Sequence, residues 1–201
     1  ELQRVIPVIE MINQKFAVPV SVDTYKPEVM RQAIDAGAQI VNDVNALQAE
    51  GALDVVSNSD VTVCLMHKKG TPQNMQLAPE YGDVVQEVCD FLQQRSLICE
   101  QAGIAKNRII LDPGFGFGKT LEHNVTLFNE MSDLLELGYP LLVGVSRKRM
   151  IGEILQDAEV GQRLFGSVSA ALLAGLKGVQ IVRVHDVKPT VDALKVASYL
   201  L

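Results

Sequence analysis

The sequence predicts an α/β protein in which helices alternate with parallel strands, and three observations support this. Six short apolar runs recur along the 201 residues, and each of them ends on a polar residue. The runs are apolar almost throughout, which is typical of parallel strands that are buried on both faces. Segments with the apolar spacing of helices lie between the runs, and this alternation is the pattern of a parallel sheet.

The predicted strands share β-rich composition and an abrupt polar end. They cover residues 19–22, 39–41, 62–66, 109–111, 141–145 and 181–184. The polar residues that follow them are Asp23, Asn42-Asp43, His67, Asp112, Ser146-Arg147-Lys148 and His185-Asp186.

The predicted helices begin with an amphipathic segment, Glu1–Phe16. The next opens on Pro27 and stops before Gly37, because Pro suits the first helical position and Gly the position past the end. Later helices are expected at 81–102, 122–137, 147–155, 161–177 and 187–201. The segment 161–177 is apolar nearly all round, so it is either buried or part of a subunit contact. No linker or domain break interrupts this order, and we expect residues 1–201 to form a single domain.

Two arrangements of six parallel strands compete. An open, doubly wound sheet would use the six strands as they stand, whereas a (β/α)8 TIM barrel needs two more units and about 250 residues. In a barrel all strand ends meet at one mouth, but in an open sheet only those near the switch point meet a ligand. Polar residues end all six strands, and the first residues already read as a helix, so we expect the chain to start in the middle of a domain. Both features favour a TIM barrel of which six of the eight βα units are present.

Composition limits the classes of partner and the location. The formal net charge of −6 argues against nucleic-acid binding, because a polyanion would be repelled. No apolar run approaches the length of a membrane span, so we expect no membrane insertion. The cysteines Cys64, Cys89 and Cys99 form no Cys-x-x-Cys pair, which indicates reduced thiols and a cytoplasmic protein.

The stretch LDPGFGFGKT, residues 111–120, resembles a phosphate-binding loop but fits neither common pattern. The Walker motif needs a glycine where Pro113 stands, and the dinucleotide fingerprint needs one where Lys119 stands. Asp112, at the end of an apolar run, is therefore the more informative residue.

The polar strand ends suit a flat, nitrogen-rich ring that carries an anion. The carboxylates of Asp23 and Asp112 can accept paired hydrogen bonds from a ring edge, and the Asn42 amide can both donate and accept. Met66 and Phe117 would cover the faces of the ring. The cationic residues Lys148, Arg183 and His185 would hold the anion, for which phosphate is the first candidate.

Each residue also has a plainer interpretation. Asp23 could cap the following helix, and Asn42-Asp43 could serve a turn. Met66 could fill the core. Lys68-Lys69 and His123 read as solvated side chains. Capping and turn chemistry alone rarely place polar groups at all six strand ends, and this favours a common site.

These residues lie in six motifs that resemble the dihydropteroate synthases, in the same order and over the whole chain. The motifs are residues 21–24 (SVDT), 41–44 (VNDV), 64–67 (CLMH), 111–119 (LDPGFGFGK), 144–148 (GVSRK) and 182–186 (VRVHD). In that family the glycine stretch is the loop after the sixth strand of a (β/α)8 barrel.

The resemblance implies an enzyme of folate biosynthesis, a transferase that uses Mg2+. It would join 7,8-dihydropterin-6-ylmethyl diphosphate to 4-aminobenzoate and release pyrophosphate. Sulfonamides, which mimic 4-aminobenzoate, would compete with that substrate. The family also implies a homodimer, with which the apolar segment 161–177 is consistent.

The resemblance also assigns roles to residues at the strand ends. The pterin site would comprise Asp23, Asn42, Met66, Asp112, Phe117, Gly144 and Lys148. Arg183 and His185 would bind the diphosphate, while Phe117, Ser146 and Lys148 would lie at the aminobenzoate. Asp23, Lys148 and Arg183 would be the catalytic residues: Asp23 stabilises the cation left on the pterin methylene, and Arg183 assists departure of the diphosphate.

The sequence departs from the family pattern in two places. The first two βα units, which carry the Asn that contacts Mg2+ and two mobile loops, have no counterpart in residues 1–201. We therefore expect a fragment without its own metal ligand. Arg149 stands where many relatives have a small hydroxyl residue, and this puts the local aminobenzoate contact in question.

Three other hypotheses stay open at this point. A pterin-binding methyltransferase barrel would bind methyltetrahydrofolate but would not need the cations Lys148, Arg183 and His185. A catalytically inactive barrel paralogue would act as a binding subunit. An unrelated phosphate-binding barrel is the third. Binding of the pterin diphosphate separates all three from the synthase.

Overall fold

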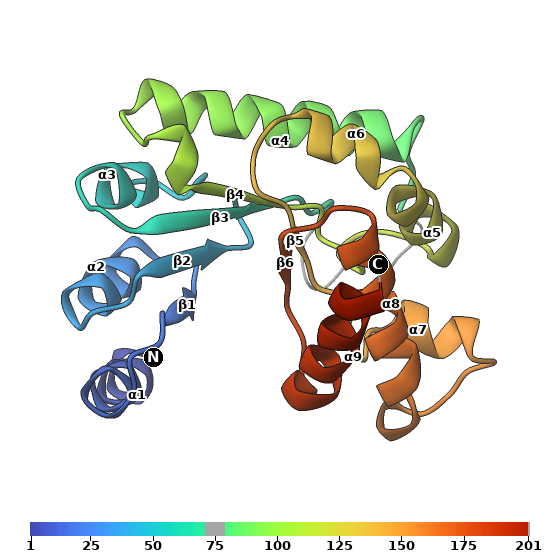
Figure 1. The fold of residues 1–201 in the computed structure, drawn as a ribbon. Helices are drawn as coiled ribbons and strands as arrows, with labels where there is room; N and C mark the ends of the chain where they lie inside the picture. Colours follow the sequence, from blue (N-terminus) through green and yellow to red (C-terminus); the bar gives the residue numbers. More distant parts are fainter. Residues whose placement is uncertain (71–78, 201) are drawn as a thin grey trace. The chain divides into compact units, whose positions relative to one another are not determined.

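The computed structural model describes residues 1–70 and 79–200, and within them strands alternate with helices as predicted (Figure 1). The strands are β1 Ser21–Asp23, β2 Ile40–Asp43, β3 Thr62–Met66, β4 Ile109–Asp112, β5 Leu142–Val143 and β6 Ile181–Val182. The α-helices are α1 Leu2–Lys15, α2 Pro27–Asp35, α3 Ala52–Ser57, α4 Val84–Gln101, α5 Leu121–Asn129, α6 Met131–Glu136, α7 Arg149–Ile154, α8 Leu164–Leu176 and α9 Val187–Leu200. Two 3-10 turns, η1 Lys106–Arg108 and η2 Val160–Gln162, precede β4 and α8.

The strands pair in parallel, as the apolar runs predicted. One sheet has the order β1-β2-β3-β4, and β5 pairs with β6 in a second sheet. In the first sheet Val22 lies opposite Val41, and Val41 lies opposite Val63. These three side chains are at most 5% exposed, because helices as well as neighbouring strands cover them.

The described residues form two compact units. The first comprises Glu1–His67 and Asp90–Leu111, and the second comprises Lys68–Cys89 and Asp112–Leu201. In the first unit Arg108 ties the start of β4 to its neighbours, since its guanidinium donates to the carbonyls of Val56 and Val61. That the chain is a single domain stays a prediction.

The core of the second unit is built around the apolar residues of α5 and α6. Phe115, Leu127, Met131, Leu134 and Leu141 are fully buried. Phe115 also packs against Phe128, with 5.9 Å between the ring centroids. The glycine stretch thus contributes a core anchor as well as a loop.

Two predicted helices differ from the structure, and one observed helix was not predicted. The segment 122–137 is two helices and not one, because the backbone at Glu130 leaves the helical region at ψ 30° and forms the shared cap of α5 and α6. No Pro or Gly marks that break in the sequence. The helix expected at 161–177 starts only at Leu164, after η2. An alternation of strands and helices requires a helix between β2 and β3. The helix α3 lies there, and the sequence patterns did not predict it.

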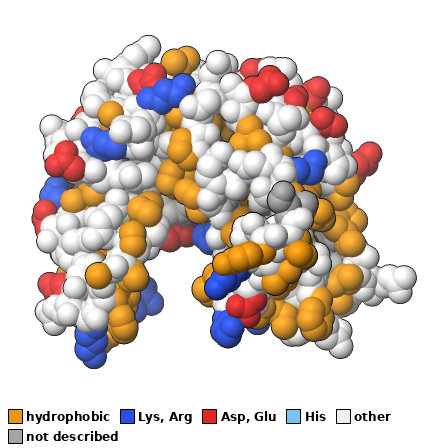
Figure 2. Space-filling view, viewed as in Figure 1, with side chains coloured by type: hydrophobic (Ala, Val, Ile, Leu, Met, Phe, Trp, Pro, Cys, Tyr) orange, Lys and Arg blue, Asp and Glu red, His pale blue; other side chains and the backbone are white. Residues whose placement is uncertain are grey.

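The helix α8 is apolar but only half buried. Its small residues Ser167, Ala171 and Ala174 face the unit, whereas Phe165 is 81% exposed and Leu173 is 51% exposed. Figure 2 shows hydrophobic side chains gathered over the part of the second unit that contains α8 and α9. Among the residues that the structure describes, no helix has both the length and the apolar character that a membrane crossing requires.

Candidate active site at the strand ends

The centre of the candidate site is an ion pair between Asp112, at the end of β4, and Arg183, just after β6. The guanidinium Nη2 donates to Asp112 Oδ2 at 2.7 Å. The carboxylate is 1% exposed, but the Arg183 side chain is 40% exposed. Asp112, predicted to bind the ring, and Arg183, predicted to bind the anion, are therefore direct partners. Part of the arginine side chain remains exposed to solvent.

The loop that follows β4 takes its shape from glycine geometry rather than from phosphate binding. Asp112 Oδ1 accepts a hydrogen bond from the Gly114 N–H at 2.8 Å, and the Phe117 N–H donates to the Gly114 carbonyl at 3.1 Å. Gly114, Gly116 and Gly118 all have φ between 65° and 78°, a region that L side chains rarely adopt. A Cβ at Gly118 would also lie only 2.1 Å from the Lys69 carbonyl oxygen. The glycine run thus serves a tight, closely packed turn.

Lys148 lies against this loop. Its ammonium donates to the Phe115 carbonyl and lies 4.6 Å from the centroid of the Phe117 ring. Burial lowers the pKa of Lys148 to about 8, although the nearby Asp112 carboxylate acts to raise it. Lys148, Phe117 and Asp112 therefore lie together, as the sequence predicted.

Gly144, which follows β5, leaves room for the Arg183 side chain. A Cβ at Gly144 would lie 3.1–3.4 Å from three atoms of the guanidinium. Such contacts are tighter than most Cβ atoms make, so a larger residue would require the guanidinium that pairs with Asp112 to shift by a few tenths of an ångström. The structure thus gives Gly144 a role in placing the arginine.

Ser146 and His185 connect the ends of β5 and β6. The Ser146 hydroxyl lies 3.1 Å from His185 Nδ1 and accepts a hydrogen bond from the His185 N–H at 3.2 Å. Ser146 is buried, whereas His185 is exposed. The histidine is therefore held at one ring nitrogen while its other edge faces solvent.

The remaining predicted residues lie in the first unit. Asp23 is exposed at the end of β1 and lies opposite Asn42 in the strand register. Asn42 and Met66 are buried, at 4% and 1% exposure. Asp23 does not cap α2, because the Lys26 N–H bonds instead to the Thr24 hydroxyl.

Asp43 confirms the plainer turn interpretation for one member of the Asn42-Asp43 pair. Its two carboxylate oxygens accept the N–H groups of Asn45 and Leu47 at 2.7 and 2.8 Å. The residues Ala46 and Leu47 have φ of 50° and 55°, so the carboxylate holds a strained turn.

Two side chains predicted to be solvated, those of Lys69 and His123, have contacts in the structure. The Lys69 ammonium bonds to Glu87 at 2.9 Å and lies 4.1 Å from the Tyr81 ring centroid. His123 completes a capping box with Thr120 at the start of α5, and its ring packs edge-on against Tyr81. Lys69 is solvent-exposed as predicted, with 44% of its side chain accessible, and His123 is half-buried. The sequence did not indicate their contacts with Tyr81, because that residue is remote from His123 in the chain.

Sequence reasoning gave no role to two polar groups at this end of the second unit. Lys119 is 3% exposed and donates to carbonyls of its own loop. Arg147 and Asp186 form a two-bond ion pair at 2.6 and 2.9 Å that links the segments after β5 and β6. Their only sequence signal was their position beside predicted site residues.

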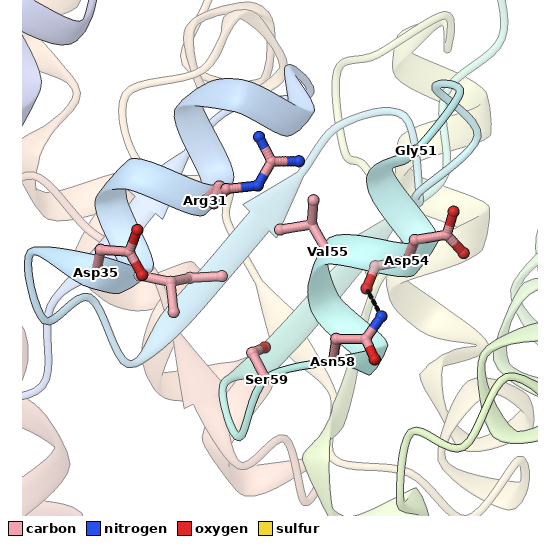
Figure 3. A pocket seen from close by; sticks show the side chains of 8 residues that line it. Arg31, Asp35, Gly51, Asp54, Val55, Asn58 and Ser59 are labelled. Carbon is pink, nitrogen blue, oxygen red and sulfur yellow. Dashed lines mark hydrogen bonds between the residues drawn. The ribbon is translucent and has the colours of Figure 1, made fainter.

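A surface pocket of the first unit lies between α2 and α3 (Figure 3). Its polar lining includes Arg31, Asp35, Asp54 and Asn58, and the Asn58 amide donates to the Asp54 carbonyl at 2.8 Å. None of the predicted site residues lines it, so it has no part in the candidate active site.

Comparison with known proteins identifies the family. Residues 1–185 match the family model described as "Pterin binding enzyme". The chain is 49% identical over 201 residues to the dihydropteroate synthase of Escherichia coli K12, covering 100% of this chain and 71% of that relative.

Solved structures agree with the sequence match. The dihydropteroate synthase of Xanthomonas albilineans in complex with 7,8-dihydropteroate has a TM-score of 0.94 at 52% identity and covers 100% of this chain and 73% of its own. The same enzyme with 4-aminobenzoic acid matches equally well, with 71% of that chain covered. The Yersinia pestis enzyme in a sulfonamide drug complex has a TM-score of 0.96 at 46% identity, with coverage of 99% and 72%.

These likenesses confirm the predicted TIM-barrel class, with six βα units in the chain. They also settle the choice between a barrel and an open, doubly wound sheet. The chain belongs to the pterin-binding enzymes, as a member of the dihydropteroate synthase family.

Proposed function

We propose that this chain carries out the dihydropteroate synthase reaction. The C–O bond between the pterin methylene and the diphosphate breaks, a C–N bond to the amine of 4-aminobenzoate forms, and the amine then loses a proton. The observation that carries the proposal is the Asp112–Arg183 pair, with Lys148 and Phe117 beside it. Direct contact between a residue that can bind a ring, Asp112, and one that can bind an anion, Arg183, suits a ligand in which a ring is joined to a diphosphate.

The pterin ring would bind through its N–H edge to Asp112. Each carboxylate oxygen has two acceptor positions, so Asp112 can keep Gly114 and Arg183 as partners and still accept hydrogen bonds from the ring. Lys148 would donate to the carbonyl side of the ring, while Phe117 and Gly144 line it. Asp23, Asn42 and Met66 stay predicted ring contacts, since they lie in the other unit.

The diphosphate would bind to Arg183 and His185. Both side chains are exposed at the segment after β6, and Ser146 fixes the orientation of the histidine. Cationic donors stabilise the negative charge that develops on a departing diphosphate. Asp23 is proposed to stabilise the cation on the methylene, so Asp23, Lys148 and Arg183 would be the catalytic residues.

The second substrate would lie near Phe117, Ser146 and Lys148. The named ligands of the relatives, 4-aminobenzoic acid and a sulfonamide, support this aromatic amine as the acceptor. Arg149 is exposed and pairs with Glu153 at 2.5 Å, so its guanidinium is directed along α7. A contact between the Arg149 backbone and 4-aminobenzoate would be the same whether the side chain is arginine or a small hydroxyl residue.

Mg2+ is the proposed cofactor of the complete site. Within residues 1–70 and 79–200 no group of three His, Cys, Asp or Glu side chains could hold a metal ion. Mg2+ is commonly held by one or two carboxylates together with water and substrate phosphates, and no step above depends on it.

We also propose that the protein is a cytoplasmic homodimer. The thiols of Cys64, Cys89 and Cys99, none in a disulfide, support a reducing compartment. The dimer is supported by an apolar groove of about 650 Å³ on the second unit, lined by residues such as Ile154, Phe165 and Leu173. Exposed apolar surface of this kind is typical of an interaction face. Phe165→Asp should convert a dimer to a monomer in light scattering, and a monomeric unaltered chain would contradict the dimer.

The reaction is tested by binding two ligands that differ only in the diphosphate. Calorimetry should show that the chain binds 7,8-dihydropterin-6-ylmethyl diphosphate and, more weakly, 6-hydroxymethyl-7,8-dihydropterin. Arg183→Met should weaken only the diphosphate compound, by about tenfold or more, the worth of one charge-assisted hydrogen bond. Lys195→Met removes an exposed cation on α9 and should change neither affinity. Equal losses for both ligands in Arg183→Met would contradict the anion-binding role.

A further inference from the structure

Lys119 is a buried cation for which the reaction gives no use. Its side chain is 3% exposed, although lysine is rarely buried without a partner. The pKa of Lys119 is lowered to about 7, mainly by burial; the Asp112 carboxylate acts to raise it and the charge of Lys148 acts to lower it. A group kept in so unfavourable a place is expected to stabilise something else.

The ammonium of Lys119 binds the two ends of one turn. Its Nζ lies 3.1 Å from the Gly114 carbonyl oxygen and 3.3 Å from that of Phe117. The same Gly114 carbonyl accepts the Phe117 N–H. The cation therefore closes the turn Gly114–Phe117 from inside, and the aromatic ring that faces Lys148 stands at the end of that turn.

Two further side chains hold the rest of the loop. Asn124, from α5, accepts the Gly116 N–H at 2.8 Å and donates to the Thr120 carbonyl at 2.6 Å. The Tyr81 hydroxyl donates to the Gly118 carbonyl at 2.7 Å. The loop after Asp112 is therefore fixed by side chains at Gly114, Gly116, Phe117 and Gly118, with Lys119 holding the part that carries the ring.

We propose that Lys119 is a positioning residue, whose ammonium holds the Gly114–Phe117 turn so that Phe117 and Asp112 are presented to the pterin ring. Its effect is exerted through the loop and not by contact with substrate. The choice of ligand rests on the proposed function, whereas the ordering of the loop does not.

Several charged groups surround Lys119 and must be considered in any titration. They are Asp112 at the end of β4, Lys148 before α7, Arg149 and Glu153 on α7, and His123 on α5. The test therefore compares variants at one pH instead of following a titration.

The first measurement is amide hydrogen exchange without ligand, which reports local opening. Lys119→Met keeps most of the side-chain volume and removes the ammonium. We expect at least tenfold loss of protection at the Gly116 and Phe117 amides and no change at Ala171 and Ala174 of α8. Lys195→Met, which removes an exposed lysine, should change none of these amides.

The second measurement is chemical rescue. Lys119→Ala removes a segment with the structure of n-propylammonium, and a pocket of about 260 Å³ lined by Gly116, Lys119 and Asn124 offers a route of entry. We expect Lys119→Ala to bind 7,8-dihydropterin-6-ylmethyl diphosphate about tenfold more weakly. Propylammonium should restore part of that affinity, and n-propanol, which fills the same space without charge, should not.

The outcomes separate this inference from the proposed function. Unchanged loop protection in folded Lys119→Met, or equal rescue by propanol, would overturn the positioning role. Should the Met and Ala variants fail to fold, Lys119→Gln retains a neutral donor, and full protection of the loop in it would show that the ammonium is not needed. A wild-type chain that does not bind the pterin diphosphate would count against the proposed function alone, because the exchange measurement uses no ligand.

Discussion

The strands β2 and β4 both end on a buried aspartate, yet the two carboxylates have different partners. Asp43, 0% exposed, bonds with both oxygens to N–H groups of its own turn, at Asn45 and Leu47. Asp112, 1% exposed, gives one oxygen to its turn at Gly114 and the other to Arg183, which lies 71 residues away.

This difference teaches how to separate a structural acid from a functional one. A carboxylate whose two oxygens each accept an N–H group of its own turn is explained by the turn that it closes. A carboxylate paired with a partly exposed arginine can still accept further hydrogen bonds. The arginine beside it is open to solvent and can bind a ligand. Burial does not distinguish them, because both are buried; the identity of the partners does.

The largest effect is expected from removing the structural acid. Asp43→Ala should lower the free energy of unfolding by about 3 kcal/mol, because two N–H groups lose a charged acceptor and the turn at Ala46 and Leu47 is strained. Urea denaturation measures this loss. Asp54→Ala, an exposed acid on α3, should change stability by less than about 0.5 kcal/mol. Equal midpoints for the two variants would contradict the structural role of Asp43.

Removing the charge of the second acid should affect binding more than stability. Asp112→Asn should weaken binding of 7,8-dihydropterin-6-ylmethyl diphosphate by about 30-fold, the worth of roughly 2 kcal/mol of charge-assisted hydrogen bonding. The loss of stability should be smaller than for Asp43→Ala, since Arg183 is solvated on one side. Calorimetry with the Asp54→Ala control checks this, and wild-type affinity in Asp112→Asn would remove Asp112 from the site.

The pH dependence of the free energy of unfolding tests the burial of Lys148, which lies near Asp112. The pKa of Lys148 is about 8 in the folded chain and 10.5 in its unperturbed state. Between these values the unfolded chain binds more protons, so stability should rise with pH, by about 2 kcal/mol from this residue. Lys148→Met should reduce that rise in urea denaturation at pH 8 and 10, and the part that remains is expected from Lys119, whose pKa is also lowered. The Lys195→Met control should keep it, and an unchanged slope in Lys148→Met would show that another group is responsible.

The smallest effect is expected at the neighbouring pair, Arg147 and Asp186. The Arg147 guanidinium lowers the pKa of Asp186, so the pair stabilises the fold above the unperturbed value of 3.8 and loses that effect as the pH falls below it. Arg147→Met should therefore reduce stability slightly at pH 7 and less at pH 3, where Asp186 begins to be protonated; the effect is small because the pair lies near the surface. Thermal unfolding at both pH values measures this, and an equal change at the two would mean that packing, not charge, is lost.

Sequence patterns alone located most of the fold because the signals are local. Apolar runs between helical segments fixed β1 to β6, and Pro27 marked the first residue of α2. The break at Glu130 was missed because neither Pro nor Gly marks it, and the helix α3 was missed because its six residues are too short for a periodic pattern.

The same residues in the chain also pointed to the chemistry of the site, since acids, an amide and cations at strand ends are visible without a structure. Only the tertiary structure decided which of them are partners. It paired Asp112 with Arg183, enclosed Asp43 in its own turn, and placed Lys119 within the loop whose glycines resemble a phosphate-binding motif. The physical reason is that hydrogen bonds and desolvation depend on the folded conformation, either of a loop, as for Asp43 and Lys119, or of two segments remote in sequence, as for Asp112 and Arg183. Strand and helix signals depend on neighbours alone.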